Sequence, residues 1–454
     1  MPETQPQLLP HSPEGDERSL LFGFSASMFR MGLALVTFEQ VRPFFDIQVS
    51  DYLFFLSLLL FLSRPKFRLM EAKASGALIA GSLILLGALL SLRNSSSLND
   101  AAGPLARLFV LFGLFAALAV IHSKDIGKNL RFLIGGISVN CVIAVLQAWV
   151  FPGIVEKLSI NPTQADLSYS GRFQGLTSHP NVLGLSAALA VLLGLELLTF
   201  DVGKRIRPRL TILVFVCILG ALLSGSRTFF VALIPGLAVF AIMQRQHLRV
   251  IARNLVALIV LGAALTYFTP SVVSEYSERL ASTGSDFAPD YGRIISAGLA
   301  LVDISQKPIV GWGIDHIEDA GMWLNPETEE LAGVHNSFLK YWYAAGIFGA
   351  AGFLAVFAVP TWQVLKALRM QLSDASKGTL PMALSTYALL FIVSNVEPIV
   401  YNRFLYVPMS VFTGYVAHLV ALGRTRMVNR KREATNAWFA GAHGKLPSVN
   451  PETN

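Results

Sequence analysis

The stretch LTILVFVCILGALLSGSRTFFVALIPGLAVFAIM, residues 210–243, contains two apolar runs separated only by Ser224-Gly225-Ser226-Arg227. Runs of this length and polarity are typical of helices that cross a bilayer. The short polar connection predicts a tight hairpin between two such helices. This stretch therefore predicts an all-α integral membrane protein.

The composition of the whole chain agrees with a membrane protein. Hydrophobic residues make up 53% of the 454 residues and charged residues only 14%, whereas soluble domains carry about 25% charged residues. The net charge of +7 comes from short basic clusters between apolar runs, which is the pattern of membrane topology and not of nucleic-acid binding. Cys141 and Cys217 both lie inside apolar runs and are expected to be small buried side chains.

Twelve apolar runs predict about twelve transmembrane helices. They cover residues 20–38, 46–63, 74–92, 104–122, 131–151, 180–199, 210–225, 227–243, 250–269, 335–360, 380–397 and 404–422. Every second connection is rich in Lys and Arg, so the positive-inside rule puts these connections and both termini in the cytoplasm.

The predicted transmembrane domain covers residues 19–424. Residues 1–18 and 425–454 are polar and are expected to be disordered cytoplasmic tails. Two long connections, about 152–179 and 270–334, lie on the outer side. The second precedes the tenth helix and is long enough to be expected to take part in function.

Four Arg residues on the outer side are candidate functional residues, because basic residues there oppose the usual insertion bias of membrane proteins. They are Arg172, Arg227, Arg293 and Arg403. We interpret Arg403 as an Arg whose charged end reaches the lipid headgroups. Three of the predicted helices begin at this outer side, each beside an Arg or His, and helix N-termini bind phosphate. Arg172, Arg227 and Arg293 therefore predict a site for a diphosphate.

His335 precedes the tenth predicted helix and is the candidate proton acceptor of this site. His179 and His316 are interpreted as ordinary structural histidines. The acidic stretch from Asp315 to Asp319 has no ligand spacing of a closed metal site, and we expect a solvated loop there. No metal ligands and no cofactor are predicted.

The motifs together resemble the bacterial O-antigen ligase and O-antigen polymerase superfamily. The resemblance covers residues 171–349 and rests on Gly171-Arg172-Phe173-Gln174-Gly175, His179-Pro180-Asn181-Val182-Leu183-Gly184, Ser224-Gly225-Ser226-Arg227, Gly292-Arg293, Gly311-Trp312-Gly313, His335-Asn336-Ser337-Phe338-Leu339 and Gly346-Ile347-Phe348-Gly349.

The resemblance implies a GT-C-like, metal-independent, inverting glycosyltransferase of the inner membrane. The implied donor is a glycan on undecaprenyl diphosphate at the periplasmic face. The implied acceptor is lipid A core for a ligase or another lipid-linked glycan for a polymerase, which can also have a chain-length regulator as a partner. Arg227 and Arg293 match the arginines that hold the diphosphate, and His335 matches the His that activates the acceptor hydroxyl. Arg172 matches a recurring Arg of the superfamily.

Three alternatives stay open at this point. Ligase and polymerase share these motifs, and the superfamily also includes protein O-oligosaccharyltransferases. A flippase of the same lipid-linked glycan would use charged groups near the bilayer midplane. Arg30, Arg107 and Glu196 are the residues of the apolar runs that such a transporter could use.

Overall fold

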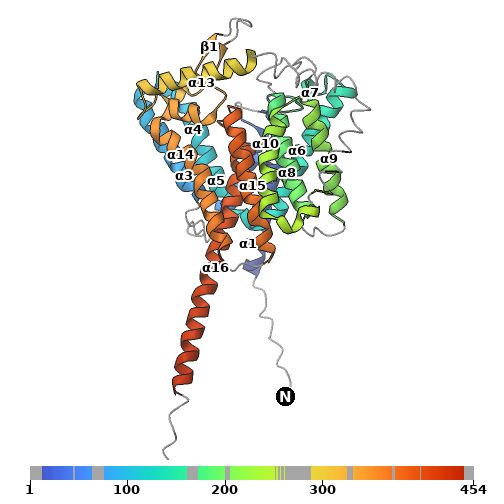
Figure 1. Ribbon diagram of the computed structural model, residues 1–454, viewed down its shortest axis with the longest axis vertical. Coiled ribbons are helices and arrows are strands. Elements are labelled where there is room, and N and C mark those ends of the chain that lie inside the picture. Colours follow the sequence, from blue (N-terminus) through green and yellow to red (C-terminus); the bar gives the residue numbers. More distant parts are fainter. Residues whose placement is uncertain are drawn as a thin grey trace, which may run out of the picture.

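The computed structural model describes residues 13–43, 47–63, 76–160, 172–199, 205–250, 252–253, 256, 260, 288–324, 331–370, 374–398 and 400–443. It is a bundle of long helices with a two-stranded sheet at one end (Figure 1). The first half contains α1 (Pro13–Ala34), α2 (Val49–Leu62), α3 (Gly76–Ser91), η2 (Leu92–Asn94), α4 (Leu98–Leu108), the π-helix η3 (Phe109–Phe115), α5 (Ala116–Ile121), η4 (Ser123–Asp125), α6 (Ile126–Trp149), α7 (Ile154–Leu158) and α8 (Pro180–Thr199). The second half contains α9 (Arg207–Leu223), α10 (Thr228–Met243), η5 (Arg245–His247), α13 (Ala288–Gln306), η6 (Ile314–His316), β1 (Trp323–Leu324), β2 (Leu331–Ala332), α14 (Ser337–Leu368), α15 (Asp374–Val396) and α16 (Arg403–His443).

The predicted all-α membrane architecture is confirmed. Within the described residues, six helical stretches are long and apolar enough to cross a membrane: Leu98–Ile121, Ser123–Trp149, Pro180–Thr199, Ser337–Leu368, Gly378–Val396 and Arg403–Ala421. Shorter apolar helices occur at Leu20–Ala34, Val49–Leu62, Leu78–Asn94 and Thr228–Met243. The predicted run 250–269 lies largely outside the described residues, so the number twelve stays a prediction.

The two ends of the chain differ from the predicted tails. α1 begins at Pro13, and α16 continues to His443 where a disordered segment from residue 425 was expected. Residues 424–440 contain many helix-favouring side chains and neither Gly nor Pro. Nothing therefore ends the helix at the predicted boundary. The start of α1 and the end of α16 lie at the same end of the bundle, opposite α13 and β1 (Figure 1). We call the end with α13 and β1 the outer end.

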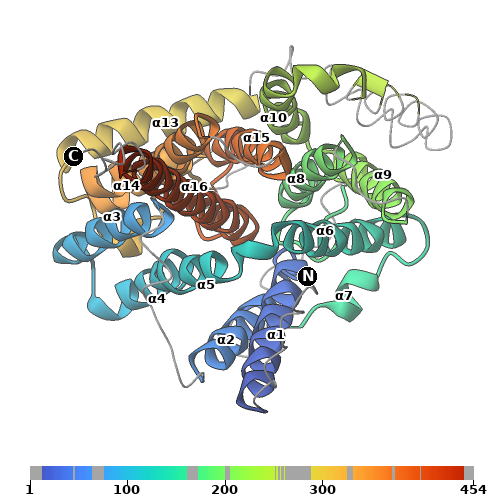
Figure 2. The same ribbon diagram turned by 90° about the horizontal axis from the view of Figure 1, so that it is seen from below.

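The connection between α9 and α10 is as short as predicted, but the two helices do not form a packed hairpin. α8 lies between them (Figure 2). A Cβ on Gly194 of α8 would lie 2.2 Å from Val214 Cγ2 of α9, and one on Gly236 of α10 would lie 2.8 Å from Leu192 Cδ2 of α8. The missing side chains let the backbones approach closely, as in other membrane helix pairs. The inner half of α8 is thereby fixed beside both neighbours.

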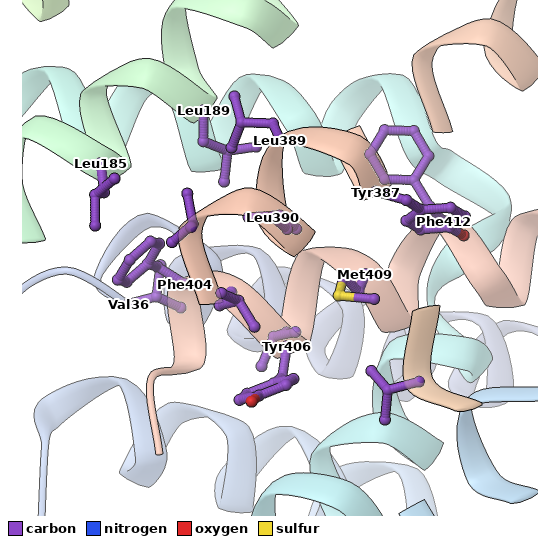
Figure 3. Packing of buried hydrophobic residues seen from close by; sticks show 14 of the residues in the cluster. Val36, Leu185, Leu189, Tyr387, Leu389, Leu390, Phe404, Tyr406, Met409 and Phe412 are labelled. Atoms are coloured by element: carbon purple, nitrogen blue, oxygen red, sulfur yellow. The ribbon is translucent and has the colours of Figure 1, made fainter. Parts of the chain in front are cut away.

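The core of the bundle lies where α8, α15 and α16 meet (Figure 3). Its side chains include Leu185, Leu189, Leu389, Leu390, Phe404, Met409 and Phe412. In α8 the burial extends all around the helix, which is expected for a helix surrounded by other helices. α8 is therefore a central element, and its N-terminus is well supported.

The helix α14 is broken near its outer end. Gly346 has φ +62° and ψ −157°, a backbone conformation that only glycine adopts easily. A Cβ on Gly349 would lie 2.5 Å from the carbonyl oxygen of Tyr341, eight residues earlier, although eight residues of straight helix span about 12 Å. The outer part, 337–345, therefore turns sharply against the inner part, 347–368.

The segment 309–313 satisfies the backbone groups that this break exposes. The amide of Trp312 donates to the carbonyl of Tyr343 (2.8 Å), and the amide of Gly313 donates to that of Ala344 (3.1 Å). The amide of Ile347 donates to the carbonyl of Ile309 (3.2 Å). The Gly311-Trp312-Gly313 and Gly346–Gly349 motifs, which are separate in sequence, thus form one hydrogen-bonded unit that we call the α14 plug.

The outer loop contains the helix α13, which the sequence analysis did not predict. Ser296, Ala300 and Ile304 form its buried stripe. α13 runs across the direction of the other helices at the edge of the bundle, from beside α10 to beside α3 (Figures 1 and 2). Its C-terminal end leads into the α14 plug, where Asn94 after α3 donates to the carbonyl of Gly311 (2.6 Å). Its N-terminal end is therefore the one beside α10.

The charges within the apolar runs have mostly local partners. Arg30 pairs with Asp125 at 2.5 Å, and Glu196 accepts a hydrogen bond from Ser385. Arg403 does not behave as a headgroup-directed Arg. It forms two hydrogen bonds with the buried Asp51 of α2, at 3.0 and 2.6 Å. The expected role of Arg403 is therefore wrong: this Arg links the start of α16 to the start of α2.

Replacing Gly346 by Ala should destabilise the protein by about 2 kcal/mol or more, because the left-handed backbone is strained for Ala. Its Cβ would also lie 2.0 Å from the carbonyl oxygen of Ile309. Thermal unfolding in detergent measures the effect. Gly135→Ala in α6 is the control, because a Cβ there meets nothing within 4 Å. Equal melting temperatures for the two variants would contradict the α14 plug.

Asp51→Asn should lower the free energy of unfolding by about 3 kcal/mol, since it leaves the Arg403 guanidinium without its buried counterion. The Asp51 side chain is 4% exposed. The matched control is Asp125→Asn, whose side chain is 54% exposed and whose loss should cost under about 1 kcal/mol. Denaturant or thermal unfolding distinguishes the two, and a larger loss in the control would refute this assignment.

Candidate active site

Arg172 closes the turn between α9 and α10. Its Nε donates to the carbonyl of Ser224 (2.9 Å), and its Nη2 donates to Oδ1 of Asn181. Gly225 has φ +59°, and a Cβ on it would lie 3.4 Å from Cγ of Arg172. The side chain of Arg172 therefore packs along the turn that carries Arg227, while its charged end reaches the first turn of α8.

The N-terminus of α8 is held by polar contacts on both sides. Nδ1 of His179 accepts a hydrogen bond from the amide of Asn181 (3.1 Å). The buried carboxylate of Glu39 accepts hydrogen bonds from the amide of Ser178 (3.0 Å) and from its hydroxyl. Nδ2 of Asn181 donates to Oε1 of Glu397 (2.8 Å). The segment before α8 is thus fixed in place, and it contacts the end of α15.

His335 faces the same carboxylate. Its Nδ1 lies 3.7 Å from Oε2 of Glu397, and among the described residues this nitrogen has no hydrogen-bond partner. The side chain of His335 is 37% exposed, whereas that of Glu397 is 9% exposed. Asn336 caps α14 by accepting from the amide of Leu339 (3.0 Å), as expected for Asn at this position. The imidazole is therefore accessible from outside and backed by a buried acid.

These contacts form one continuous series at the outer end of the bundle. It runs through His335, Glu397, Asn181, Arg172 and Ser224. Residues from four separate parts of the chain meet here because the N-terminal ends of α8 and α14 and the turns after α9 and α15 lie at the same level.

Arg227 directly precedes α10 and is partly buried. Its neighbour Ser226 packs against α8, since a Cβ on Gly184 would lie 2.5 Å from Cβ of Ser226. Ser226 does not cap α10; its hydroxyl instead bonds that of Thr228 (2.5 Å). The N-termini of α8 and α10 thus meet beside Arg172 and Arg227, which places two predicted site residues in one region.

Arg293 lies on α13, outside this series of contacts. α13 is connected to the His335 segment in two steps. A Cβ on Gly321 would lie 2.1 Å from the carbonyl oxygen of Ser296, and the amide of Val334 donates to the carbonyl of Ala320 (2.9 Å). The structure therefore ties the helix that carries Arg293 to the residue before His335, without a direct contact between the two predicted side chains.

Burial lowers the pKa of His179 to about 4, with a further lowering by Arg172 and His335 and an opposing effect of Glu397. His179 is therefore neutral near pH 7, in agreement with its Nδ1 accepting a hydrogen bond. Because this half-buried imidazole is neutral, it adds no positive charge beside Arg172. The site thus contains two different histidines: an internal neutral one and the accessible His335.

The acidic stretch after Gly313 was expected to be a solvated loop, but hydrogen bonds hold it against the segment after α3. Oδ2 of Asp315 accepts from the amide of Ser96 (2.7 Å), and Nε2 of His316 contacts the Ser96 hydroxyl (2.8 Å). Burial raises the pKa of Asp315, but the nearby Ser95 hydroxyl and the hydrogen bond from the Ser96 amide outweigh this effect and hold the pKa below its usual value. Glu318 pairs with Lys340 of α14. Among the described residues, no group of three His, Cys, Asp or Glu side chains could hold a metal ion.

Residues 212–354 match a family model described as O-antigen ligase. The expected resemblance to the O-antigen ligase and polymerase superfamily is confirmed. No curated protein matches the chain. The match includes Arg227, Arg293 and His335, and it indicates a glycosyl-transferring membrane enzyme of surface-polysaccharide biosynthesis. Arg172, Asn181 and Glu397 lie outside the matched segment. Arg172 was predicted from the sequence, whereas the contacts of Asn181 and Glu397 with the site appear only in the fold.

Sequence reasoning missed Glu397 and left His179 aside. A signal for Glu397 exists, because it is an acidic residue directly after an apolar run, at the same predicted membrane face as His335. Carboxylates near a lipid-facing surface are costly unless they have partners. The partner itself could not be identified, since His335 and Asn181 are far from Glu397 in sequence.

The stability of the protein should fall as the pH drops from about 6.5 to 4, in part because of His179. The pKa of His179 is lower in the folded than in the unfolded protein, so the unfolded state takes up a proton at a higher pH. The stability that is present above pH 6.5 is therefore lost as the pH falls. His179→Gln should reduce this loss, which melting temperatures at pH 7 and pH 4.5 measure. An undiminished pH dependence in the variant would show that His179 is protonated in the folded protein.

Proposed function

We propose that the protein is an inner-membrane glycosyltransferase. It moves a glycan from undecaprenyl diphosphate to an acceptor hydroxyl at the periplasmic face, in O-antigen or exopolysaccharide biosynthesis. The observation that supports this most is the continuous series of contacts from His335 through Glu397 and Asn181 to Arg172. It holds a proton-accepting group and a cationic region close together at the outer end of a membrane-spanning bundle.

The cationic region suits a diphosphate. Arg172 and Arg227 lie at the meeting point of the α8 and α10 N-termini, and both the guanidinium groups and the helix ends favour bound phosphate oxygens. In this proposal Arg293 reaches the same diphosphate from the α10 end of α13. The polyprenyl chain of such a donor remains in the bilayer beside the helices, while its diphosphate stays at the surface.

His335 is proposed to act as the general base. Its Nδ1 faces the Glu397 carboxylate, so a proton on Nδ1 leaves the Nε2 lone pair for the acceptor. In the reaction, the acceptor O–H bond breaks and its proton passes to Nε2 of His335. The acceptor oxygen forms a bond with the anomeric carbon, and the bond from that carbon to the diphosphate oxygen breaks. The electron pair leaves with the diphosphate, whose new charge the Arg residues stabilise.

Direct attack inverts the configuration at the anomeric carbon, and none of these steps needs a metal ion. Glu397 acts through His335 as a positioning residue: it orients the imidazole and balances the charge that forms on it. The same site serves a ligase, with lipid A core as the acceptor, or a polymerase, with a second lipid-linked glycan. A protein acceptor, as in the protein O-oligosaccharyltransferases, and a flippase activity are the alternatives.

Protein in nanodiscs with an undecaprenyl-diphosphate-linked repeat unit, with or without lipid A core and with EDTA throughout, should transfer glycan. His335→Ala should reduce kcat by about 10²–10⁴-fold, the usual contribution of a general base. Arg227→Ala and Arg293→Ala should each reduce it by about 10²–10³-fold, as for lost oxyanion donors. Glycan size and acceptor mass by mass spectrometry measure the products.

Arg93→Gln is the matched control, because Arg93 is an exposed cation in η2, outside the site, and its activity should be unchanged. Glu397→Gln should lower kcat with little change in the KM of the donor, which separates positioning from binding. A ladder without core indicates a polymerase, and a core-dependent single product indicates a ligase. If no condition gave transfer and the donor instead moved between leaflets of liposomes, the protein would be a flippase and the proposal wrong.

A further inference from the structure

Arg107 is a cation in a predicted membrane span for which the proposed function gives no role. It lies in the last turn of α4, and its side chain is exposed. Its guanidinium carbon lies 5.7 Å from the ring centroid of Tyr401. No carboxylate of the described residues forms an ion pair with it. An Arg in a membrane helix is costly and usually marks a functional position.

The backbone around Arg107 is also unusual. The π-helix η3 begins two residues after it and covers Phe109–Phe115, whereas π-helical segments are rare and often occur at functional sites. Phe112 of η3 packs on Tyr406 (ring centroids 4.8 Å apart) and on Tyr341 (6.4 Å). The irregular segment thus fits α4 against α14 and α16 and fixes the position of Arg107 beside Tyr401.

Tyr401 offers a second unsatisfied group at this place. Its hydroxyl is buried and, in the described part of the chain, has no hydrogen-bond partner. Burial, with a smaller effect of Glu318, raises the pKa of Tyr401 above its usual value, so the hydroxyl remains a donor. Unpaired buried donors are uncommon in folded proteins. A cation without an ion-pair partner and a hydroxyl without a hydrogen-bond partner lie next to each other among the described residues. An anionic oxygen would satisfy this combination.

The turn between α15 and α16 connects this pair to the candidate active site. Glu397 lies at its beginning and Tyr401 near its end. The Ser337 hydroxyl donates to the carbonyl of Glu397 (3.2 Å), and the Tyr341 hydroxyl donates to that of Val400 (2.8 Å). The turn is therefore fastened along the outer part of α14, with His335 near one end and Arg107 near the other.

The two ends of this turn, one near His335 and the other near Arg107, lie on different sides of the bundle. α4 is on the far side of α16 from α8 and α10 (Figure 2). In an inverting transfer, the attacking oxygen approaches the anomeric carbon from the side opposite the leaving group. With the diphosphate beside α8 and α10, the acceptor approaches from the side of α4.

We propose that Arg107 and Tyr401 form a second phosphate position, which binds the acceptor lipid while the Arg172 and Arg227 region binds the donor. This inference rests on the proposed function. Both acceptor classes carry phosphate at the membrane surface: the phosphorylated core of lipid A for a ligase, and the diphosphate of a second lipid-linked unit for a polymerase. The guanidinium of Arg107 binds the phosphate, and Tyr401 supports it.

The test compares the rate of glycan transfer by Arg107→Gln and by the unchanged protein in nanodiscs. One series varies the acceptor concentration at saturating donor, and the other varies the donor concentration at saturating acceptor. The KM of the acceptor should rise by about ten-fold to a hundred-fold, the range of one lost charge-assisted hydrogen bond, while the KM of the donor stays within about two-fold. Tyr401→Phe should raise the acceptor KM less. Arg93→Gln, an exposed cation near the same outer end, should change neither value.

Two acceptors separate the sources of phosphate. If lipid A core is the acceptor, treating it with phosphatase should raise the KM of the unchanged protein and remove the difference from Arg107→Gln. If a second lipid-linked unit is the acceptor, core should have no effect and the Arg107→Gln defect should appear in chain extension. Normal transfer with an unchanged acceptor KM in Arg107→Gln would overturn this inference alone. No transfer by the unchanged protein would overturn the proposed function and this inference with it.

Discussion

A membrane helix can be interrupted only if other groups take over the hydrogen bonds that it loses, because hydrocarbon offers none. The rest of the outer end depends on this requirement at Gly346. The carbonyls of Tyr343 and Ala344 and the amide of Ile347 find their partners in residues 309–313. The break turns the outer part of α14 so that His335 and Asn336 meet the end of α15, and the plug fixes the C-terminal end of α13. One backbone constraint thus sets the position of the candidate base and of the helix that carries Arg293.

The second determinant is how closely the helices approach one another. Glycines on α3, α8 and α10 lie tightly against neighbouring helices: Gly87 against the backbone of Ala345 and Gly349, Gly184 against Ser226, and Gly236 against the side chain of Leu192. Membrane helices lack a hydrophobic driving force for association, so close packing of this kind is a main source of their stability. Here it also brings two helix N-termini and the turn with Arg172 to one level. Packing in the bundle and electrostatics at its surface are therefore consequences of the same contacts.

The polar groups at the outer end are arranged in pairs that compensate one another. Glu397 lies between His335 and Asn181, and Asn181 connects it to Arg172. Glu39 holds the segment before α8, and Asp51 neutralises Arg403 at the start of α16. Buried carboxylates are tolerated because each has a cation or several donors. The side chain of His335, 37% exposed, lies at the accessible edge of these pairs.

The sequence by itself determined the all-α membrane class, the positions of the described apolar helices and the choice of His335 and the Arg residues, since hydropathy and local charge are properties of neighbouring residues. It also predicted the family, because the motifs keep their order and spacing. Only the tertiary structure decided that Glu397 faces His335, that Arg403 pairs with Asp51, that α8 separates α9 from α10, and that two glycine motifs form one plug. Each of these joins residues that are distant in the chain, and helix periodicity carries no information on which helices become neighbours. The helix α13 was missed for a related reason: its apolar stripe is too narrow for a span, and its place across the bundle is set by contacts with other segments.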